Sequence, residues 1–235
     1  NENMIVTGLT PGATYYFAVR AEDERPNLGG LSNSPSAVAK GPCGNITTNL
    51  TWSPANNPYV VTCDVTIAAG ITLTIQPGTI LTFNSATGIT ITTTGTLNAT
   101  GTAEQPILFT SNQITPTAGY WKGINFGATS ANSVLDHVIV EYGGGSGIGN
   151  VSTSGAVIQV KNSTIRYSSN YGVYAISITN ITLFNNALLN NTTYSASLSF
   201  TNGTFTSLGG NTGTGNGKNA IVLAGTLGTN TTLPV

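Results

Sequence analysis

The sequence feature that most restricts the fold is a short pattern that recurs about every twenty residues in the second half of the chain. Each copy has an apolar residue, a small polar or imidazole side chain two positions later, and an apolar residue five positions after the first. The copies are residues 135–140, 160–165, 178–183 and 200–205, and their starts lie 25, 18 and 22 residues apart. A unit of this size cannot bury a hydrophobic face alone, so the repeat predicts a solenoid of stacked coils.

The regular structure within each coil is predicted to be β-strand. Short runs such as Ile71, Leu73 and Ile75 alternate apolar and polar residues, and Gly, Asn and Pro separate the runs. Alternation with period two indicates strands, whereas the 3.6-residue period of a helix is not found. We therefore expect an all-β fold in which residues 59–235 form a single-stranded parallel β-helix.

Stacking of coils predicts a ladder of side chains at one turn. Equivalent residues of neighbouring coils lie about 4.8 Å apart. Asn162, Asn180 and Asn202 occupy the same place in the repeat, and His137 precedes them. We expect the three amides to form an inward-facing Asn ladder that His137 heads.

The first forty residues have a different pattern. Short strands are expected at residues 4–6 and 15–21, and Gly29 with Gly30 predicts a hairpin-like break before a polar strand that ends near Pro35. Residues 41–58 are rich in Gly, Pro and Asn and are predicted to be a linker. The expected organisation is therefore a small unit at 1–40, a linker at 41–58 and the β-helix at 59–235.

The N-terminal unit resembles the end of a fibronectin type III domain. The resemblance rests on Leu-Thr-Pro-Gly-Ala-Thr-Tyr at 9–15, followed by Phe17, Val19 and Ala21. It implies a small partial β-sandwich in which Tyr15 is the corner tyrosine. Because the match covers about the last three of seven strands, an open edge must be covered by upstream strands, by the β-helix, or by a neighbouring subunit through β-augmentation.

The segment 59–144 resembles the right-handed β-helix repeat region of large microbial surface proteins. The resemblance is carried, in order, by Val-Val-Thr at 60–62, the run at 71–79, Gly-Thr-Leu-Asn-Ala-Thr-Gly-Thr at 95–102, Pro-Ile-Leu-Phe-Thr-Ser at 106–111, Trp-Lys-Gly-Ile at 121–124 and Val-Glu-Tyr-Gly-Gly at 140–144. It implies a right-handed solenoid and an extracellular scaffold, adhesive or polysaccharide-contacting role, with no single activity.

Composition excludes several partners. Charged residues make up 6% of the chain and the net charge is -1, so the basic patch that nucleic acid requires is missing. No apolar run reaches the roughly 18–20 residues of a membrane-spanning helix. The chain does not begin with Met or a signal peptide, and we expect it to be a processed or excised piece of a longer protein.

Two cysteines, Cys43 and Cys63, lie twenty positions apart. In a sequence rich in glycosylation sequons we predict a disulfide, which places the chain outside the cell or on its surface. Two buried thiols are the alternative. A metal site is not expected, because two thiolates without neighbouring His do not complete a zinc shell, and we expect no cofactor.

Parallel β-helices also carry polysaccharide lyases and hydrolases, whose chemistry needs paired carboxylates or calcium-binding acids with a base. Beyond residue 57 the acids occupy four positions, none equivalent on adjacent coils: Asp64, Glu104, Asp136 and Glu141. One catalytic hypothesis groups Asp136, His137, Glu141 and Arg166. Asp136 is expected to point away from His137, and Glu141 to be structural, so we predict no catalytic site and no enzyme.

Surface chemistry suggests three further hypotheses. A carbohydrate-binding platform along one flank would consist of Tyr120, Trp121, Tyr142, Tyr167, Tyr171 and Tyr174. The Thr-X-Thr pairs at 72–74 and 90–92 resemble ice-binding solenoids, but Lys161, Ser163 and Arg166 interrupt the series. The candidate N-glycan sites are Asn45, Asn49, Asn98, Asn150, Asn190, Asn191 and Asn230.

The function expected from the sequence is structural. The low charge and the stackable ends of a β-helix favour an extracellular scaffold, plausibly a self-assembling subunit of a filament, sheath or surface layer. Self-contact would use the N-terminal strand edge or the β-helix ends. A carbohydrate-binding adhesin is the alternative, and a partial polysaccharide lyase is a third hypothesis.

Overall fold

The computed structural model describes residues 14–25, 27–38, 42–130 and 132–228. The chain divides into two compact units, Asn1–Gly41 and Pro42–Val235. Each unit is described by itself below.

The described part of the first unit is an antiparallel ribbon of short strands. β1 (Thr14–Tyr16) pairs with β4 (Ser36–Val38), and β2 (Arg20–Glu22) pairs with β3 (Leu28–Leu31). The predicted break at Gly29 and Gly30 is wrong, because both glycines lie inside β3.

The reversal of the ribbon lies between β2 and β3. There Asp23 accepts hydrogen bonds from the Asn27 side chain and from the main-chain N–H groups of Asn27 and Arg25. These bonds, the Asn27 side-chain bond first, lower the pKa of the Asp23 carboxyl.

The structure does not show the fibronectin-like sandwich. Large apolar side chains of the ribbon face solvent, and Tyr16 and Leu31 are 72% and 71% exposed. The predicted strand at 4–6, and the turn at 9–12 against which Tyr15 would act as a corner residue, lie outside the described residues.

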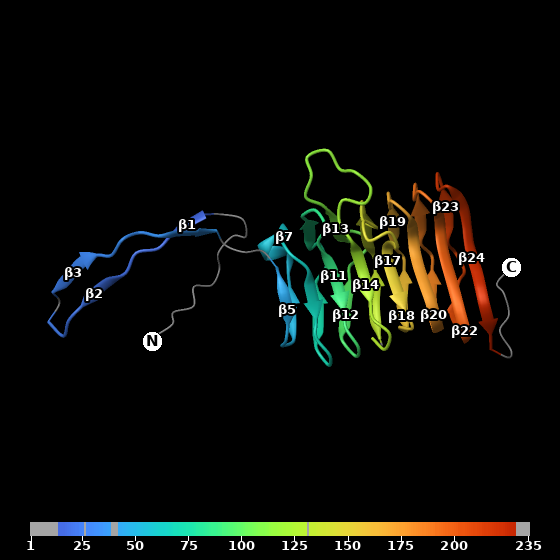
Figure 1. Ribbon diagram of the computed structural model, residues 1–235, viewed down its shortest axis with the longest axis horizontal. Helices are drawn as coiled ribbons and strands as arrows, with labels where there is room; N and C mark the ends of the chain where they lie inside the picture. The colour runs from blue at the N-terminus through green and yellow to red at the C-terminus, as the bar shows by residue number, and fades with distance from the viewer. Residues whose placement is uncertain (1–13, 26, 39–41, 131, 229–235) are drawn as a thin grey trace. The chain divides into compact units, whose positions relative to one another are not determined.

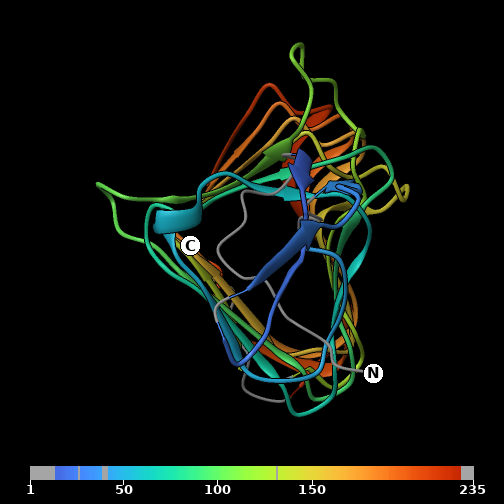
Figure 2. The same cartoon turned by 90° about the vertical axis from the view of Figure 1, so that its left-hand side faces the viewer.

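The second unit is a parallel β-helix with three faces, so the predicted solenoid is confirmed. Figure 2 shows its coils superimposed in a three-sided outline, and Figure 1 shows them side by side. The first face contains β5 (Gly44–Ile46), β8 (Val65–Ile67), β11 (Gly88–Ile91), β14 (Gly123–Phe126), β17 (Gly149–Ser154) and the N-terminal parts of β20 (Tyr171–Phe184), β22 (Tyr194–Ser207) and β24 (Lys218–Leu227).

The second and third faces complete each coil. The second face contains β6 (Leu50–Trp52), β9 (Thr72–Ile75), β12 (Thr96–Thr100), β15 (Ser133–Asp136), β18 (Ile158–Lys161) and the later parts of β20 and β22. The third face contains β7 (Tyr59–Val61), β10 (Ile80–Phe83), β13 (Ile107–Ser111), β16 (Val138–Glu141), β19 (Thr164–Arg166), β21 (Ala187–Leu189) and β23 (Thr212–Thr214).

Alternation within each strand fills the interior. Leu73 and Ile75 of β9 are buried and lie in register with Leu97 and Ala99 of β12, while the residues between them face outward. Each inward side chain therefore stacks on a similar residue of the next coil, which gives the continuous core that the repeat predicted.

The stretch predicted as a linker instead forms the first coil. β5 and β6 pair in parallel with β8 and β9, and Trp52 is buried with its ring stacked 5.3 Å from that of Tyr59. A short 3₁₀ turn, η1 (Pro54–Asn56), connects β6 to β7. Gly, Pro and Asn mark the corners of this coil, which the sequence pattern could not distinguish from a flexible connection.

The predicted disulfide between Cys43 and Cys63 is confirmed. It joins the residue before β5 to the segment before β8, and the Gly44 N–H donates to the Asp64 carbonyl beside it. The covalent bond therefore fixes the first coil to the second.

The predicted Asn ladder is wrong in its members. Asn180 lies in register with Thr204, and the Asn202 N–H donates to Thr226 Oγ1. Asn162 instead accepts a hydrogen bond from Asn185 Nδ2, 23 residues later. The repeat beginning at Ile178 was counted several residues early, because 18 residues are too few for this coil.

The observed ladder at this corner consists of residues with left-handed backbone conformation. His137 heads it, as predicted, and the φ angles are 50°, 51°, 56° and 69° for His137, Asn162, Asn185 and Gly210. Asn, His and Gly tolerate this conformation better than other residues do, so one requirement of the backbone explains all four residue types.

Two further ladders of amides lie inside the β-helix. In one, the Ser163 N–H donates to Asn186 Oδ1 and the Asn186 N–H donates to Asn211 Oδ1. In the other, Ser168, Asn191 and Asn216 repeat the arrangement, as the next paragraphs use. These amides satisfy main-chain groups where the chain turns between faces.

Candidate functional site

The four residues of the catalytic hypothesis occupy two separate places. Glu141 ends β16 on the third face and Arg166 ends β19 beside it, and the two are register partners. His137 precedes β16 at the opposite end of that strand. Four residues of extended chain separate His137 from Glu141 by about 13 Å, so the structure does not bring the four together.

The Glu141 carboxylate is buried and fully used by its neighbours. Thr110 Oγ1 donates to Oε1 at 2.8 Å, and Arg166 Nε donates to Oε2 at 2.7 Å. Its main-chain carbonyl accepts from Trp121 Nε1. This environment agrees with the structural role that the sequence predicted for Glu141.

Asp136 and His137 do contact each other, contrary to the prediction that they point apart. The two residues lie at a corner rather than in one strand, and His137 Nδ1 is 2.8 Å from Asp136 Oδ1. Asp136 also accepts from Asn162 Nδ2 at 2.9 Å and lies 3.4 Å from Lys161 Nζ. An unextended backbone at His137 produces this pair, and nothing in the alternation pattern predicts it.

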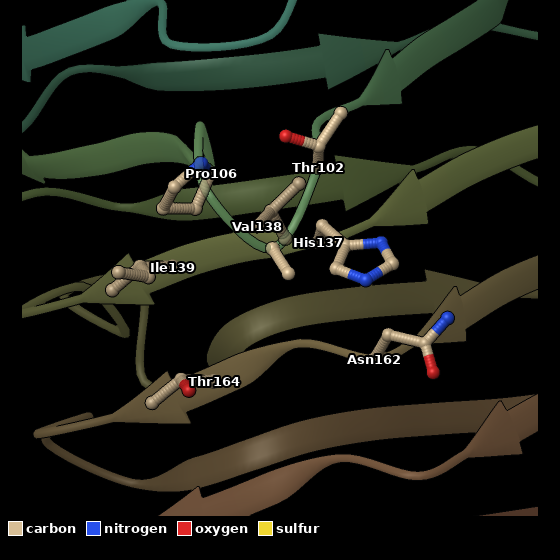
Figure 3. A pocket seen from close by; sticks show the side chains of 8 residues that line it. Thr102, Pro106, His137, Val138, Ile139, Asn162 and Thr164 are labelled. Atoms are coloured by element: carbon tan, nitrogen blue, oxygen red, sulfur yellow. The ribbon is translucent and has the colours of Figure 1, made fainter.

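A small notch on the outer surface adjoins this pair (Figure 3). The loop that connects β12 to β13 forms one wall, and the neighbouring coils form the other. The notch has a volume of about 280 Å³ and is lined by Thr102, Ala103, Pro106, His137, Val138, Ile139, Asn162 and Thr164.

These groups can orient and bind a polar molecule, but they lack the features of a familiar polysaccharide-cleaving centre. Hydrolysis requires two carboxyl groups on either side of one bond, and the described residues contain one carboxylate near the notch, that of Asp136. Within the part of the chain that the structure describes, no group of three or more His, Cys, Asp or Glu side chains could hold a metal ion.

The predicted aromatic platform is not one surface. Trp121 is completely buried and stacks on Phe83 at 4.0 Å, so it is wrong as a surface residue. Tyr142 and Tyr167 stack on each other at 5.1 Å at one corner, beside Tyr120, whose N–H donates to the Tyr142 carbonyl.

A second group of tyrosines lies on the first face. Tyr171 is 4.9 Å from Tyr174 and stacks at 6.0 Å on Tyr194, a residue that the sequence hypothesis did not include. Lys218 lies over the Tyr194 ring on the following coil. A register of 23 residues between coils would have placed Tyr194 beside Tyr171, once the coil length was known.

Stacking along the axis changes what these rings can offer. Neighbouring rings that lie within 11° of parallel cover each other's faces, as do Tyr142 with Tyr167 and Tyr171 with Tyr194. Sugar rings usually pack on an exposed aromatic face, so the stacks present mainly ring edges and hydroxyl groups outward.

Tyr142 has a shifted titration. Burial raises the pKa of its hydroxyl, and the charges of Glu141 and of ionised Tyr167 raise it further, while Arg166 opposes them. The Tyr142 hydroxyl is therefore neutral over a wider pH range than that of a free tyrosine.

The sequon residues divide by exposure. Asn150 and Asn191 are completely buried, which is contrary to their predicted loop positions. Asn98 is partly buried, and Asn230 lies outside the described residues. Three candidates are exposed, namely Asn45, Asn49 and Asn190.

The Thr-X-Thr pairs lie on different faces. Thr72 and Thr74 belong to β9, whereas Thr90 belongs to β11 and pairs with Thr66 and Asn125. The pairs do not form the single flat array that binding to ice requires.

Among the described residues, no helix has the length and apolar character to cross a membrane. Comparison with known proteins identifies one family. The model of the pectate-lyase-like β-helix domain matches residues 44–169, whereas no curated protein and no solved structure matches the chain. The matched segment begins at β5, the first coil, and covers more than half of the 235 residues. The chain therefore belongs to the family of pectate-lyase-like β-helix domains.

Proposed function

We propose that the chain is a structural, non-catalytic module of the extracellular surface, which assembles with copies of itself through the ends of its β-helix. The observation that carries this proposal is the last described coil. β24 pairs in parallel with β22 and with no other strand of the described chain. Its outer edge is a row of main-chain groups available for another strand.

The interior is also open at this end. A hollow of about 260 Å³ is lined by core residues such as Leu188 and Ile221 together with the ladder amide of Asn211. Within the described chain, the ladder from Ser163 through Asn186 stops at Asn211. A further coil would extend both the aliphatic core and this ladder.

The opposite end offers a matching edge. β5, β6 and β7 each pair with one strand of the following coil and with no other described strand. All these pairs are parallel, so contact between the two ends would be head to tail, and heterologous contacts that do not close form filaments. The low charge of the chain opposes association only weakly.

Sedimentation velocity and electron microscopy over a range of concentrations test the proposal. Ala220 is exposed and lines the end hollow, so Ala220→Lys places a charge at the contact without removing a core side chain. Thr179→Lys places the same charge at an exposed position in the middle of β20 and is the matched control.

We expect filaments or concentration-dependent oligomers for the unaltered chain and for Thr179→Lys, and fewer of them for Ala220→Lys. A monodisperse monomer at high concentration would contradict assembly through the ends. Loss of assembly in both variants would assign the effect to general charge repulsion.

A second candidate function is carbohydrate binding, which would make the chain an adhesin. Family membership favours it, as do the tyrosine hydroxyls and ring edges along the coils, including Tyr171, Tyr174 and Tyr194. A glycan array tests this candidate, and the absence of binding to every polysaccharide would leave the scaffold alone.

A further inference from the structure

The notch beside His137 contains an imidazole whose orientation is fixed. The Asp136 carboxylate can only accept, so His137 Nδ1 carries the hydrogen of their 2.8 Å contact. In the neutral ring Nε2 is then an acceptor, and the described chain provides no recorded partner for it. Such a carboxylate–histidine pair holds the second ring nitrogen ready for an external donor.

The walls of the notch combine an apolar surface with a few polar groups. Pro106 and Ile139 lie on one side of His137 in Figure 3, and Thr164 is the register partner of Ile139 on the next coil. Binding sites for small molecules typically have this mixture. A sugar ring presents the complementary pattern, because C–H groups alternate with hydroxyl groups around it.

The size of the notch limits the ligand. Its volume of about 280 Å³ lies near the lower end of the roughly 300–1,000 Å³ range of ligand pockets. It therefore accommodates about one sugar unit, while the remainder of a chain would extend along the outer surface of the coils.

The charges indicate which class of sugar fits. Recognition of a uronate requires a free cation or a bound metal ion. In the described β-helix, Lys161 lies beside Asp136, Arg166 is paired with Glu141, and Lys122 is paired with Asp64. None of these cations lines the notch.

We propose that the notch formed by His137, Pro106, Ile139 and Thr164 binds one neutral sugar unit of a polysaccharide, with His137 Nε2 accepting a hydrogen bond from a sugar hydroxyl. This proposal rests on carbohydrate binding, the second candidate function, and specifies its site and ligand class. It separates this chain from a domain that recognises acidic polymers.

Calorimetric titration with neutral oligosaccharides (xylo-, gluco-, manno- and galacto-oligomers) and with oligogalacturonate tests the proposal. His137→Asn places at the corner the residue that follows it in the ladder, so the backbone conformation is retained. Asn190→Gly is the matched control, because Asn190 has the same left-handed conformation at another corner, outside the notch.

We expect at least one neutral series to bind, oligogalacturonate to bind more weakly, and His137→Asn to lower the affinity roughly tenfold, as the loss of one hydrogen bond predicts. Asn190→Gly should bind like the unaltered chain. Thr164→Val, which removes one hydroxyl at nearly constant volume, should also weaken binding.

Three results would overturn the proposal in distinguishable ways. If no oligosaccharide binds, carbohydrate binding itself is refuted. If neutral sugars bind but His137→Asn and Thr164→Val leave the affinity unchanged, carbohydrate binding stands and the notch is not its site. Preference for oligogalacturonate would refute the ligand class.

Discussion

Arg166 donates to a single oxygen of Glu141 from two nitrogens, Nε at 2.7 Å and Nη2 at 2.6 Å, and the two residues are register partners on neighbouring coils. The other carboxylate oxygen accepts from Thr110 on the preceding coil. The Glu141 side chain is 9% exposed and that of Arg166 is 36% exposed. Three coils are thus joined through one buried carboxylate.

Removal of the cation should destabilise this region. Arg166→Met leaves the Glu141 carboxylate buried without a counter-ion, and we expect a loss of about 2 kcal/mol in the free energy of unfolding, below the full cost of breaking a buried pair because Arg166 is partly exposed. Urea unfolding measures the change.

Two further variants make this prediction specific. Glu141→Gln combined with Arg166→Met should recover most of the loss, since no charge remains buried. Lys122→Met, which breaks the exposed pair with Asp64, should cost less than about 1 kcal/mol. Equal losses in Lys122→Met and Arg166→Met would show that burial of Glu141 is not the cause.

The fold of the second unit could be predicted because its cause is local. Alternating apolar residues such as Leu73 and Ile75 specify strands whose inward faces need a partner, and a repeat too small for its own core requires stacking. The disulfide followed from the two cysteines in the same way.

The register of the coils could not be predicted, because it depends on coil lengths that vary. The separation is 28 residues from Asn84 to Asn112 and 23 residues from Asn162 to Asn185. A motif that tolerates such variation can align with the wrong residue, as Asn180 did. The ladder and the tyrosine platform were wrong for this one reason.

The contact between Asp136 and His137 was missed for a different reason. Alternation places successive side chains on opposite faces only while the backbone is extended. His137 has a φ of 50°, which ends β15 and turns its side chain toward Asp136. The later ladder residues Asn162 and Asn185 were the available signal, since Asn also tolerates this conformation.

Asn191 should be essential for the stability of its coil. Its Oδ1 accepts from the Ser168 N–H, and its Nδ2 donates to the Ile165 carbonyl. Asn191→Ala leaves these buried groups without partners, at a cost of about 3 kcal/mol. Hydrogen exchange at the Ser168 amide should accelerate accordingly.

The neighbouring residue provides the control for this prediction. Asn190 is exposed and has a φ of 53°, so Asn190→Gly should change stability little, because Gly adopts this conformation without strain. Unchanged exchange at Ser168 in Asn191→Ala would contradict a structural role for the buried amide.

The same pair predicts the pattern of glycosylation in a secretory host that attaches N-glycans. Asn45, Asn49 and Asn190 are exposed and should be modified, whereas Asn150 and Asn191 are buried and hydrogen bonded and should not be. Peptide mass mapping identifies the occupied sites. A glycan on Asn191 in the folded protein would be incompatible with the interior ladder.

Tyr142 predicts a loss of stability at alkaline pH. Its pKa in the folded chain is raised, first by burial and then by the charges of Glu141 and Tyr167. The unfolded chain therefore releases this proton at a lower pH than the folded chain does. Its contribution is fully present below the unfolded pKa of about 10 and is lost as pH rises through the higher folded value.

Tyr142→Phe tests this assignment, because it removes the ionising group and retains the ring that stacks on Tyr167. We expect the free energy of unfolding of the unaltered chain to fall more steeply above about pH 10 than that of Tyr142→Phe, while the two curves run parallel at neutral pH. Tyr120→Phe, at a tyrosine for which no such burial effect is found, is the comparison. Curves that remain parallel at every pH would mean that the Tyr142 hydroxyl titrates alike in both states, and that the stacked corner does not exclude water from it.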